Sequence, residues 1–282
     1  MKILLKIAYD GSAFLGWQYQ PDRPTVVAEI NRAAKDLFGF DCDVTGCSRT
    51  DAGVHALGFC ATVSERGKSG IETHLSPERI AAALNVRLPD TVAVKSAAFV
   101  PDGFHPRYDA VSKTYRYLFA LSPERDPFLA GRVYIPRRRL DGKAVRLMSE
   151  AAGYLAGEHD FASYMNSGSD IKDTVRTVFF ADVAEKDGFA VFTVTGNGFL
   201  YNMVRIMAGT LLDAGMSKIS PRDILTITEA RDRSAAGKTL PPYALYLVRV
   251  DYPDDRLITP DQAGKSDRQS GCGKAADHRA RK

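Results

Sequence analysis

Two spacings of apolar residues run along the first hundred residues of the chain. Short or alternating apolar runs are typical of strands, and apolar residues three or four apart are typical of helices. Thr25 is predicted to cap a helical spacing that stops at Gly39, and Ser76 followed by Pro77 is typical of a helix start. The predicted elements are a strand over 2–9, a helix between Thr25 and Gly39, strands near 42–47 and 57–63, a helix from 77 to about 86, and a strand over 91–100.

The second part of the chain repeats this rhythm. A long strand over 111–121 should carry Lys113, Tyr115, Tyr117 and Phe119 on one face, because side chains alternate along a strand. The remaining predicted elements are a helix after Asp141, strands over 174–183 and 189–195 around a turn at 186–188, helices over 199–214 and after Ser220–Pro221, and a last strand over 243–250.

These elements predict an α+β fold of two similar subdomains. Each subdomain should be a mainly antiparallel sheet with helices on one face, as in RRM and ferredoxin-like folds, with the two sheets joined around a central cleft. We place the N-terminal subdomain at residues 1–103 and the C-terminal subdomain at 104–252. Residues 253–282 are rich in Gly, Asp, Lys and Arg, which favours a disordered tail.

The composition is that of a soluble globular protein. Apolar residues make up 45% of the chain and charged residues 26%, which supports a large core. No apolar run approaches the roughly 18 residues that span a bilayer, and the start of the chain does not resemble a signal peptide. Four cysteines without a C-x-x-C pair, and five histidines without ligand-like spacing, predict no metal and a cytoplasmic location.

The charge of the chain leaves a nucleic-acid partner open. The net charge is +4, and residues 254–282 hold seven Lys and Arg against five Asp, so the body carries only +2. A simple basic nucleic-acid binder carries more. A polyanion site would need local clusters, such as Arg137–Arg139 or the scattered Arg49, Arg107, Arg116, Arg176 and Arg205.

The densest group of reactive side chains lies in residues 46–56, GCSRTDAGVHA, between two predicted strands. Glycines near both ends and Arg49, Asp51 and His55 between them are typical of a loop that presents catalytic groups. The same segment could be an ordinary hairpin in which Asp51 bonds to its own backbone. The segment alone leaves both interpretations open.

A second unusual feature is the charge of Arg205. It is the only charged residue from Phe189 to Leu212, and it lies in a predicted helix that is apolar nearly all round. Such a helix is buried, and an unpaired buried charge costs several kcal/mol. Arg205 therefore needs a carboxylate or phosphate partner, unless its head escapes at the helix end. Asp51 is the best candidate partner.

Other motifs carry less information. Tyr115 lies in the aromatic and basic run Lys113–Tyr117, a pattern that can stack bases but is also common in packed sheets. Trp17 is a further candidate for an exposed binding side chain. A dinucleotide fingerprint starting at Gly196 lacks its third glycine, and a nucleophile elbow starting at Gly46 lacks its closing glycine.

Taken together, these motifs resemble one family, that of tRNA pseudouridine synthase A. The resemblance covers roughly residues 1–252 and follows the family's order, which is more specific than any single motif. The sequence departs from the family at Ser48, where Gly is frequent, and at Phe59, where Gln is frequent. The matching stretches are Tyr9–Gly11, Phe14–Gln18, Ser48–Ala56, Phe104–Arg107, Lys113–Tyr117, Gly157–Phe161, Gly198–Arg205 and Pro241–Leu247.

The resemblance implies a reaction and a role for four residues. Members of the family isomerise uridines 38–40 of the tRNA anticodon stem-loop, without cofactor or metal, by breaking the N1–C1′ bond, rotating the uracil and joining C5 to C1′. Asp51 matches the essential aspartate, which acts as nucleophile or base at the ribose. Tyr115 matches the tyrosine that stacks on the uracil and takes the C5 proton. Arg205 matches the arginine paired with the aspartate, and Arg49 the residue that enters the RNA helix. The resemblance also implies a homodimer that binds tRNA across both subunits.

Three rival functions remain at this point. A related pseudouridine synthase could act on other RNA positions, and a non-catalytic protein could bind tRNA without turnover. A hydrolase built on Ser48, Asp51 and His55 is disfavoured, because three residues so close together in one loop do not easily form a triad.

Overall fold

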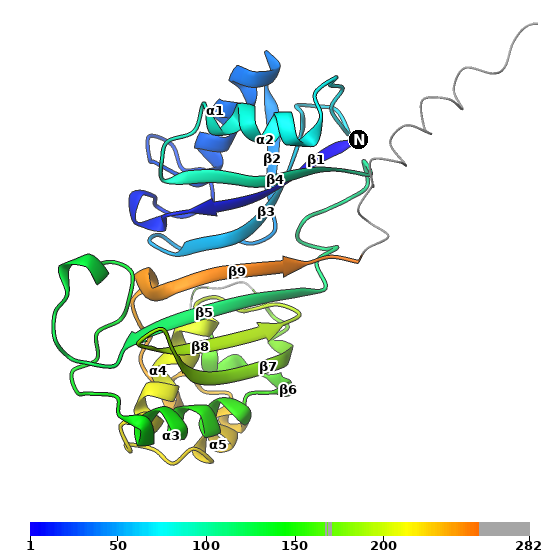
Figure 1. Cartoon of the computed structure of the whole chain (residues 1–282). Helices are drawn as coiled ribbons and strands as arrows, with labels where there is room; N and C mark the ends of the chain where they lie inside the picture. The colour runs from blue at the N-terminus through cyan, green and yellow to red at the C-terminus, as the bar shows by residue number, and fades with distance from the viewer. Residues whose placement is uncertain (167, 169–170, 254–282) are drawn as a thin grey trace, which may run out of the picture.

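A computed structural model of the chain describes residues 1–166, 168 and 171–253 (Figure 1). Residues 254–282 of the predicted tail lie outside the described residues. The strands form one sheet in the order β4-β1-β3-β9-β5-β8-β7-β6, with β2 paired to β3. The predicted α+β class is confirmed.

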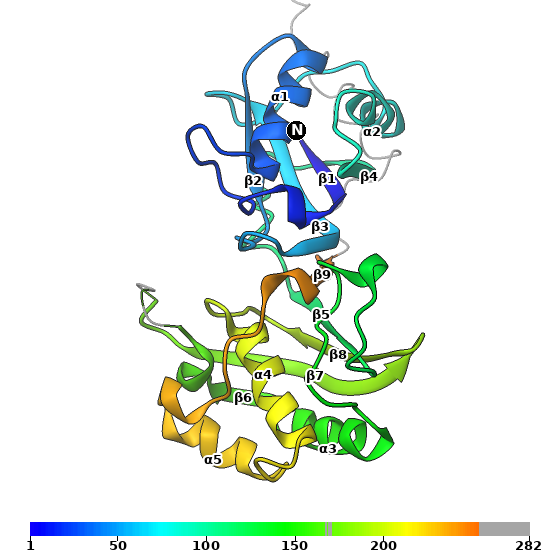
Figure 2. The same ribbon diagram turned by 90° about the vertical axis from the view of Figure 1, so that its left-hand side faces the viewer.

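The N-terminal half places two helices against an antiparallel sheet. In Figures 1 and 2 both helices lie on the same side of the strands. Its elements are β1 (Lys2–Tyr9), α1 (Val26–Phe38), β2 (Cys42–Gly46), β3 (His55–Glu65), α2 (Pro77–Asn85) and β4 (Val92–Val100).

The C-terminal half has a similar layout, with three helices beneath its sheet in Figure 2. The helix-facing side of the sheet carries the buried side chains of Lys113, Tyr115, Tyr117 and Phe119, as the alternation predicted. The elements are β5 (Ser112–Ala120), α3 (Gly142–Gly153), β6 (Gly157–Asp160), β7 (Val175–Lys186), β8 (Phe189–Gly196), α4 (Met203–Gly215), α5 (Asp223–Ala230) and β9 (Leu245–Asp251).

The two halves meet where β3 runs parallel to β9. Two residue pairs define this register, His55 with Tyr246 and Ala56 with Leu247. Farther along, a Cβ added to Gly58 would lie 2.5 Å from the Val248 carbonyl oxygen, so only glycine allows the two backbones to approach this closely. The single sheet therefore brings the loop before β3 next to the C-terminal half.

Several predicted element boundaries are confirmed at atomic detail. The Ser76 side chain accepts a hydrogen bond from the Arg79 N–H, and Asp141 accepts one from Ala144, so both cap their helices. Gly39 ends α1 in the left-handed region, with φ 80°. The turn between β7 and β8 contains Asp187 and Gly188, both at positive φ, as hairpin turns require.

Other expectations were wrong in detail. Thr25 precedes α1 but makes no side-chain cap bond, and its hydroxyl is buried without a hydrogen-bond partner. The helix predicted from residue 199 begins only at Met203, because Asn202 has φ 61°, which is not helical. The short strand β6 was not predicted, since its four residues, GEHD, lack an apolar pattern.

The buried thiol of Cys47 predicts a loss of stability at alkaline pH. Desolvation by burial raises the pKa of this thiol from its ordinary 9.0 to about 12. In the folded protein the Cys47 thiol therefore keeps its proton to a higher pH than in the unfolded chain. The contribution of this thiol to the free energy of unfolding is complete below about pH 9 and is lost as the pH rises toward 12.

Urea unfolding at pH 8 and pH 10.5 measures this effect. Between these two pH values, the wild type should lose up to about 2 kcal/mol more unfolding free energy than Cys47→Ala. Equal losses in the two proteins would show that Cys47 does not contribute.

Candidate active site

The loop between β2 and β3 is held by the segment that follows β1. The backbone N–H of Trp17 donates to the Thr50 carbonyl at 3.2 Å, and the Tyr9 hydroxyl bonds to the Thr50 hydroxyl at 2.8 Å. Gly16 has φ +91°, and a Cβ there would lie 2.6 Å from the Thr50 carbonyl oxygen. The motif around residues 9–18 is therefore a support for the loop.

Trp17 itself is not an exposed binding side chain. It is 5% exposed and stacks on Phe59, with ring centroids 4.0 Å apart. A Cβ on Gly46 would lie 2.6 Å from the indole ring, so the Trp17 ring fits only because residue 46 has no side chain. The expectation of a surface tryptophan was wrong because the alternation of local polarity does not reveal this packing against β3.

Arg205 of α4 meets Asp51 of the loop, 154 residues away in sequence. The guanidinium Nη1 donates to Asp51 Oδ2 at 3.0 Å, and Nε donates to the Leu240 carbonyl at 2.7 Å. Nη1 also donates to the side-chain oxygen of Asn202. The Arg205 side chain is 15% exposed and that of Asp51 32%. The buried-charge argument, which required a carboxylate for Arg205, is confirmed by this contact.

Tyr115 lies on β5 beside the same loop. It is 7% exposed, its ring meets Phe199 edge-on at 5.1 Å, and its hydroxyl lies 3.4 Å from the Ser48 hydroxyl. Burial, together with the nearby negative charge of Asp51, raises the pKa of Tyr115 well above its ordinary range, against the lowering effect of the Ser48 hydrogen bond. The phenol is therefore neutral at neutral pH, with Asp51 close enough to influence it.

A buried lysine adds a contact that the sequence did not reveal. Lys113 shares its strand face with Tyr115 and donates Nζ to the Cys47 carbonyl at 2.8 Å. Desolvation lowers the pKa of Lys113. The only available signal was a lysine in the buried row of β5, which does not identify its partner. Lys113 thus joins β5 to the start of the loop.

The loop also carries Arg49, which is exposed. The structure therefore brings Asp51, Arg205 and Tyr115 together and leaves Arg49 on the surface next to them. An anchored carboxylate beside a buried aromatic ring can stabilise positive charge at a sugar carbon while a base stacks nearby. Within the described residues, no three His, Cys, Asp or Glu side chains gather in a way that could hold a metal ion.

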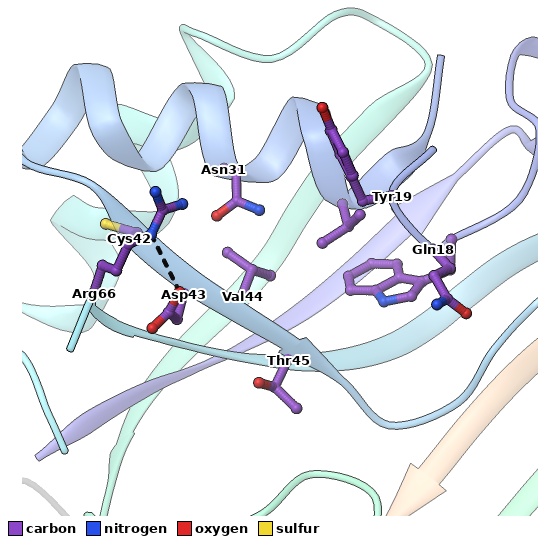
Figure 3. Close-up of a pocket in the computed structure, with 10 residues that line it drawn as sticks. Gln18, Tyr19, Asn31, Cys42, Asp43, Val44, Thr45 and Arg66 are labelled. Carbon is purple, nitrogen blue, oxygen red and sulfur yellow. Dashed lines mark ion pairs between the residues drawn. The ribbon is translucent and has the colours of Figure 1, made fainter. Parts of the chain in front are cut away.

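A separate hollow lies between α1 and β2 and has a volume of about 450 Å³ (Figure 3). Its lining includes Tyr19, Asn31 and Arg66, and Arg66 pairs with Asp43 across it. None of Asp51, Tyr115 and Arg205 lines it. The Asp51–Arg205 pair, by contrast, holds a partly exposed carboxylate beside Tyr115.

Comparisons with known proteins identify the family of the chain. A family model described as tRNA pseudouridine synthase matches residues 6–109 and 151–253. The tRNA pseudouridine synthase A of Ruminiclostridium cellulolyticum is 42% identical over 252 residues, covering 89% of this chain and 99% of that protein. The proteins of the same name from Caldicellulosiruptor saccharolyticus and Bacillus subtilis are each 43% identical, again covering 89% of this chain and 99% of the relative.

No helix among the described residues is long and apolar enough to cross a bilayer.

The matched residues include the Asp51 loop, Tyr115 lies a few residues past the first matched segment, and Arg205 lies in the second. Because the family model covers most of the chain and the relatives are similar over nearly their whole length, the chain belongs to the tRNA pseudouridine synthases, isomerases that act on tRNA.

Proposed function

We propose that this protein converts uridines 38–40 of the tRNA anticodon stem-loop to pseudouridine, with Asp51 as the essential residue. The observation that carries the proposal is the 3.0 Å contact between Arg205 and Asp51, which fixes one carboxylate beside the buried ring of Tyr115. The relatives named tRNA pseudouridine synthase A support the choice of tRNA as substrate.

The first step in this proposal is extrusion of the target nucleotide. A base inside a stem must leave its stack before its glycosidic bond can be attacked, at a cost of a few kcal/mol. Stacking on an aromatic ring is worth about 1–3 kcal/mol per base, so Tyr115 can offset part of this cost. In this proposal Arg49, which is exposed on the same loop, enters the RNA helix and fills the vacated position.

The second step is chemistry at the ribose. As the N1–C1′ bond breaks, positive character develops at the sugar, which the Asp51 carboxylate stabilises as nucleophile or base. Arg205 holds that carboxylate in place through bonds to Asp51 and Leu240. After rotation, C5 of the uracil bonds to C1′ and loses its proton, while N1 gains one, so that the product is an isomer of the substrate. The reaction needs no cofactor, because it only rearranges bonds within one nucleotide.

Tyr115 receives the C5 proton in this proposal. Because its resting phenol is neutral, its own proton must leave as the C5 proton arrives, and that proton passes to N1 of the detached uracil, with the Ser48 hydroxyl, 3.4 Å away, as a relay. We expect Tyr115→Phe to keep the stacking and the burial but to lower turnover by about 10²- to 10⁴-fold. Phe119→Tyr, in the same buried row of β5, is not a suitable control because it buries a new hydroxyl.

The measurement for Tyr115→Phe is release of tritium from tRNA labelled at C5 of uridine, together with tRNA affinity. Tyr154→Phe, at the end of α3, is a matched control that removes one hydroxyl elsewhere. Wild-type tritium release by Tyr115→Phe would rule out Tyr115 as the base while leaving its stacking role intact.

We further propose that the protein acts as a cytoplasmic homodimer. The body carries a net charge of only +2, so two subunits that pool their basic surfaces would hold a tRNA better than one. Light scattering of the purified protein, with and without tRNA, tests this: a monomer in both conditions would contradict it.

The decisive test of the function is mapping pseudouridine in tRNA. Purified protein and unmodified tRNA should release C5 tritium, and tRNA from a strain lacking the gene should lack pseudouridine at positions 38–40. Loss at other positions would indicate a related synthase with a different target. Binding without tritium release would indicate a non-catalytic tRNA-binding protein.

A further inference from the structure

His55 occupies the junction between the two halves of the molecule. It is the first residue of β3, four positions after Asp51, and it is 2% exposed. It is paired with Tyr246 across the β3–β9 register, and the two rings stack with centroids 4.7 Å apart. The imidazole is therefore packed in the seam, out of reach of a substrate.

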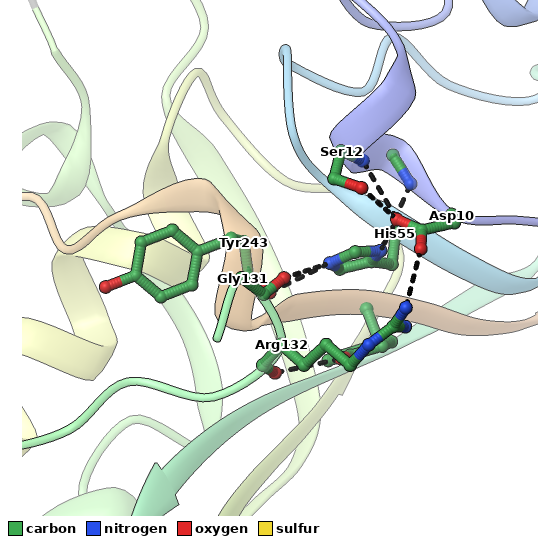
Figure 4. Close-up of polar contacts among 8 residues, drawn as sticks. Asp10, Ser12, His55, Gly131, Arg132 and Tyr243 are labelled. Carbon is green, nitrogen blue, oxygen red and sulfur yellow. Dashed lines mark hydrogen bonds and ion pairs between the residues drawn. The ribbon is translucent and has the colours of Figure 1, made fainter. Parts of the chain in front are cut away.

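Both ring nitrogens of His55 bond to the backbone of other segments (Figure 4). Nδ1 accepts the Gly11 N–H at 3.1 Å, which places the ring proton on Nε2. Nε2 lies 2.9 Å from the Tyr243 carbonyl and 3.0 Å from the Gly131 carbonyl, so one N–H faces two acceptors. One side chain thus joins three segments that are far apart in sequence.

The Asp10 carboxylate closes this cluster. Its Oδ2 pairs with Arg132 Nη2 at 2.9 Å, and its Oδ1 lies 3.2 Å from His55 Nδ1 without a proton between them, so the ion pair with Arg132 is the bond that counts. Arg132 follows Gly131, so the Asp10–Arg132 pair holds the Gly131 segment against the N-terminal half next to the histidine. Figure 4 shows these groups converging from three different ribbons.

The Tyr243 carbonyl belongs to a segment that also binds Arg205. The Leu240 carbonyl accepts from Arg205 Nε at 2.7 Å, and the Pro241 carbonyl accepts from the Tyr117 hydroxyl at 2.9 Å. The Pro242 ring packs on the Asp51 loop, where a Cβ on Gly53 would lie 3.3 Å from it. Four consecutive residues, 240–243, therefore connect Arg205, β5, the Asp51 loop and His55.

We infer that His55 is a positioning residue that sets the separation of Asp51 and Arg205 by fastening the Asp51 loop to the 240–243 segment. The inference rests on the proposed function, because the pair it positions is the pair assigned to the reaction. Arg205 bonds to the Leu240 carbonyl, and His55, which follows the Asp51 loop, bonds through Nε2 to the Tyr243 carbonyl. Both ends of the Asp51–Arg205 pair are therefore attached to the same segment. Small displacements of reacting groups can cost about 100-fold in rate.

Two substitutions test the contributions of the two ring nitrogens of His55 separately. His55→Gln keeps an N–H donor at about the reach of Nε2, whereas His55→Asn keeps an acceptor at about the reach of Nδ1 and loses the bond to Tyr243. We expect His55→Asn to lower kcat for tRNA about 10- to 100-fold with KM within about twofold, and His55→Gln to retain kcat within about threefold.

Ser163→Ala is the matched control for loss of buried bonds. Ser163 is 0% exposed, donates to the Ile227 carbonyl at 2.6 Å and accepts from the Asp232 N–H at 2.9 Å, in the α5 region. It should lower the melting temperature but leave kcat unchanged. If His55→Asn does not fold, Pro242→Ala, which removes the ring contact with Gly53, should still lower kcat several-fold.

The outcomes separate this inference from the proposed function. Absence of turnover in the wild type contradicts the function itself. An active wild type with equal kcat in His55→Asn and His55→Gln, or a loss seen only in KM, overturns the positioning role. A readout without turnover is the crystal structure of His55→Asn, in which the Asp51–Arg205 contact, 3.0 Å in the wild type, should lengthen or break. An unchanged contact there would also overturn the inference.

Discussion

Replacing Asp51 by Asn is expected to stop pseudouridine formation while leaving tRNA binding within about twofold. The amide has the shape of the carboxylate and can still accept the hydrogen bond from Arg205, so the fold should survive. It carries no charge, however, and can neither attack nor stabilise the developing cation at C1′. We expect turnover to fall by at least about 10³-fold, since electrostatic stabilisation of this kind alone is worth about 10²- to 10³-fold.

Tritium release and a tRNA binding assay should be measured on the same preparation of Asp51→Asn. Asp43→Asn is the matched control, because Asp43 is an exposed acid on β2 that pairs with the exposed Arg66. The control should behave as wild type in both assays. Turnover by Asp51→Asn near the wild-type rate would remove the basis for the proposed mechanism.

Replacing Arg205 by Lys is also expected to slow the reaction strongly. Lysine keeps the positive charge but has one ammonium group, which cannot reproduce the geometry of the guanidinium. Arg205 uses Nε for the Leu240 carbonyl and Nη1 for Asp51 and Asn202 at the same time. The variant must give up part of this set, so the carboxylate loses its fixed orientation. We expect kcat to fall about 10²-fold.

The measurement is kcat and KM for tRNA by tritium release, with thermal unfolding to exclude a loss of folded protein. Arg231→Lys is a matched control, because the Arg231 Nε pairs with Asp160 at 3.1 Å on the surface and the residue is 68% exposed. Exposed pairs contribute about 0–1 kcal/mol, so this variant should remain close to wild type. Equal kcat in Arg205→Lys and the wild type would show that charge alone, without the fixed geometry, is sufficient.

Much of the fold could be predicted from local patterns. The strand over 2–9, the helix ending at Gly39 and the capped helix after Ser76 were predicted with bounds close to those observed. These signals act over a few residues: side-chain alternation, a capping hydroxyl or carboxylate, and a glycine that tolerates positive φ. The start of α4 was wrong because Asn202 adopts a left-handed conformation inside an otherwise helical apolar run.

The candidate site was partly predictable for a different reason. Arg205 is a lone charge on an apolar helix, and the cost of burying it unpaired required a carboxylate partner whatever the topology. That argument favoured Asp51 without identifying it uniquely, and the resemblance to a family supplied the same pairing. The raised pKa of Tyr115 could not be predicted, since it depends on burial by Phe199 and other distant residues.

The amino-acid sequence by itself therefore determined the elements, the α+β class and the need of Arg205 for a partner. Only the tertiary structure decided that β3 lies beside β9, that Trp17 is buried, and that His55 bonds to Gly11, Gly131 and Tyr243. The physical reason is range. Propensities and caps depend on neighbours in sequence. The bond from His55 to Tyr243, in contrast, joins residues 188 positions apart, and such contacts arise only when the whole chain packs.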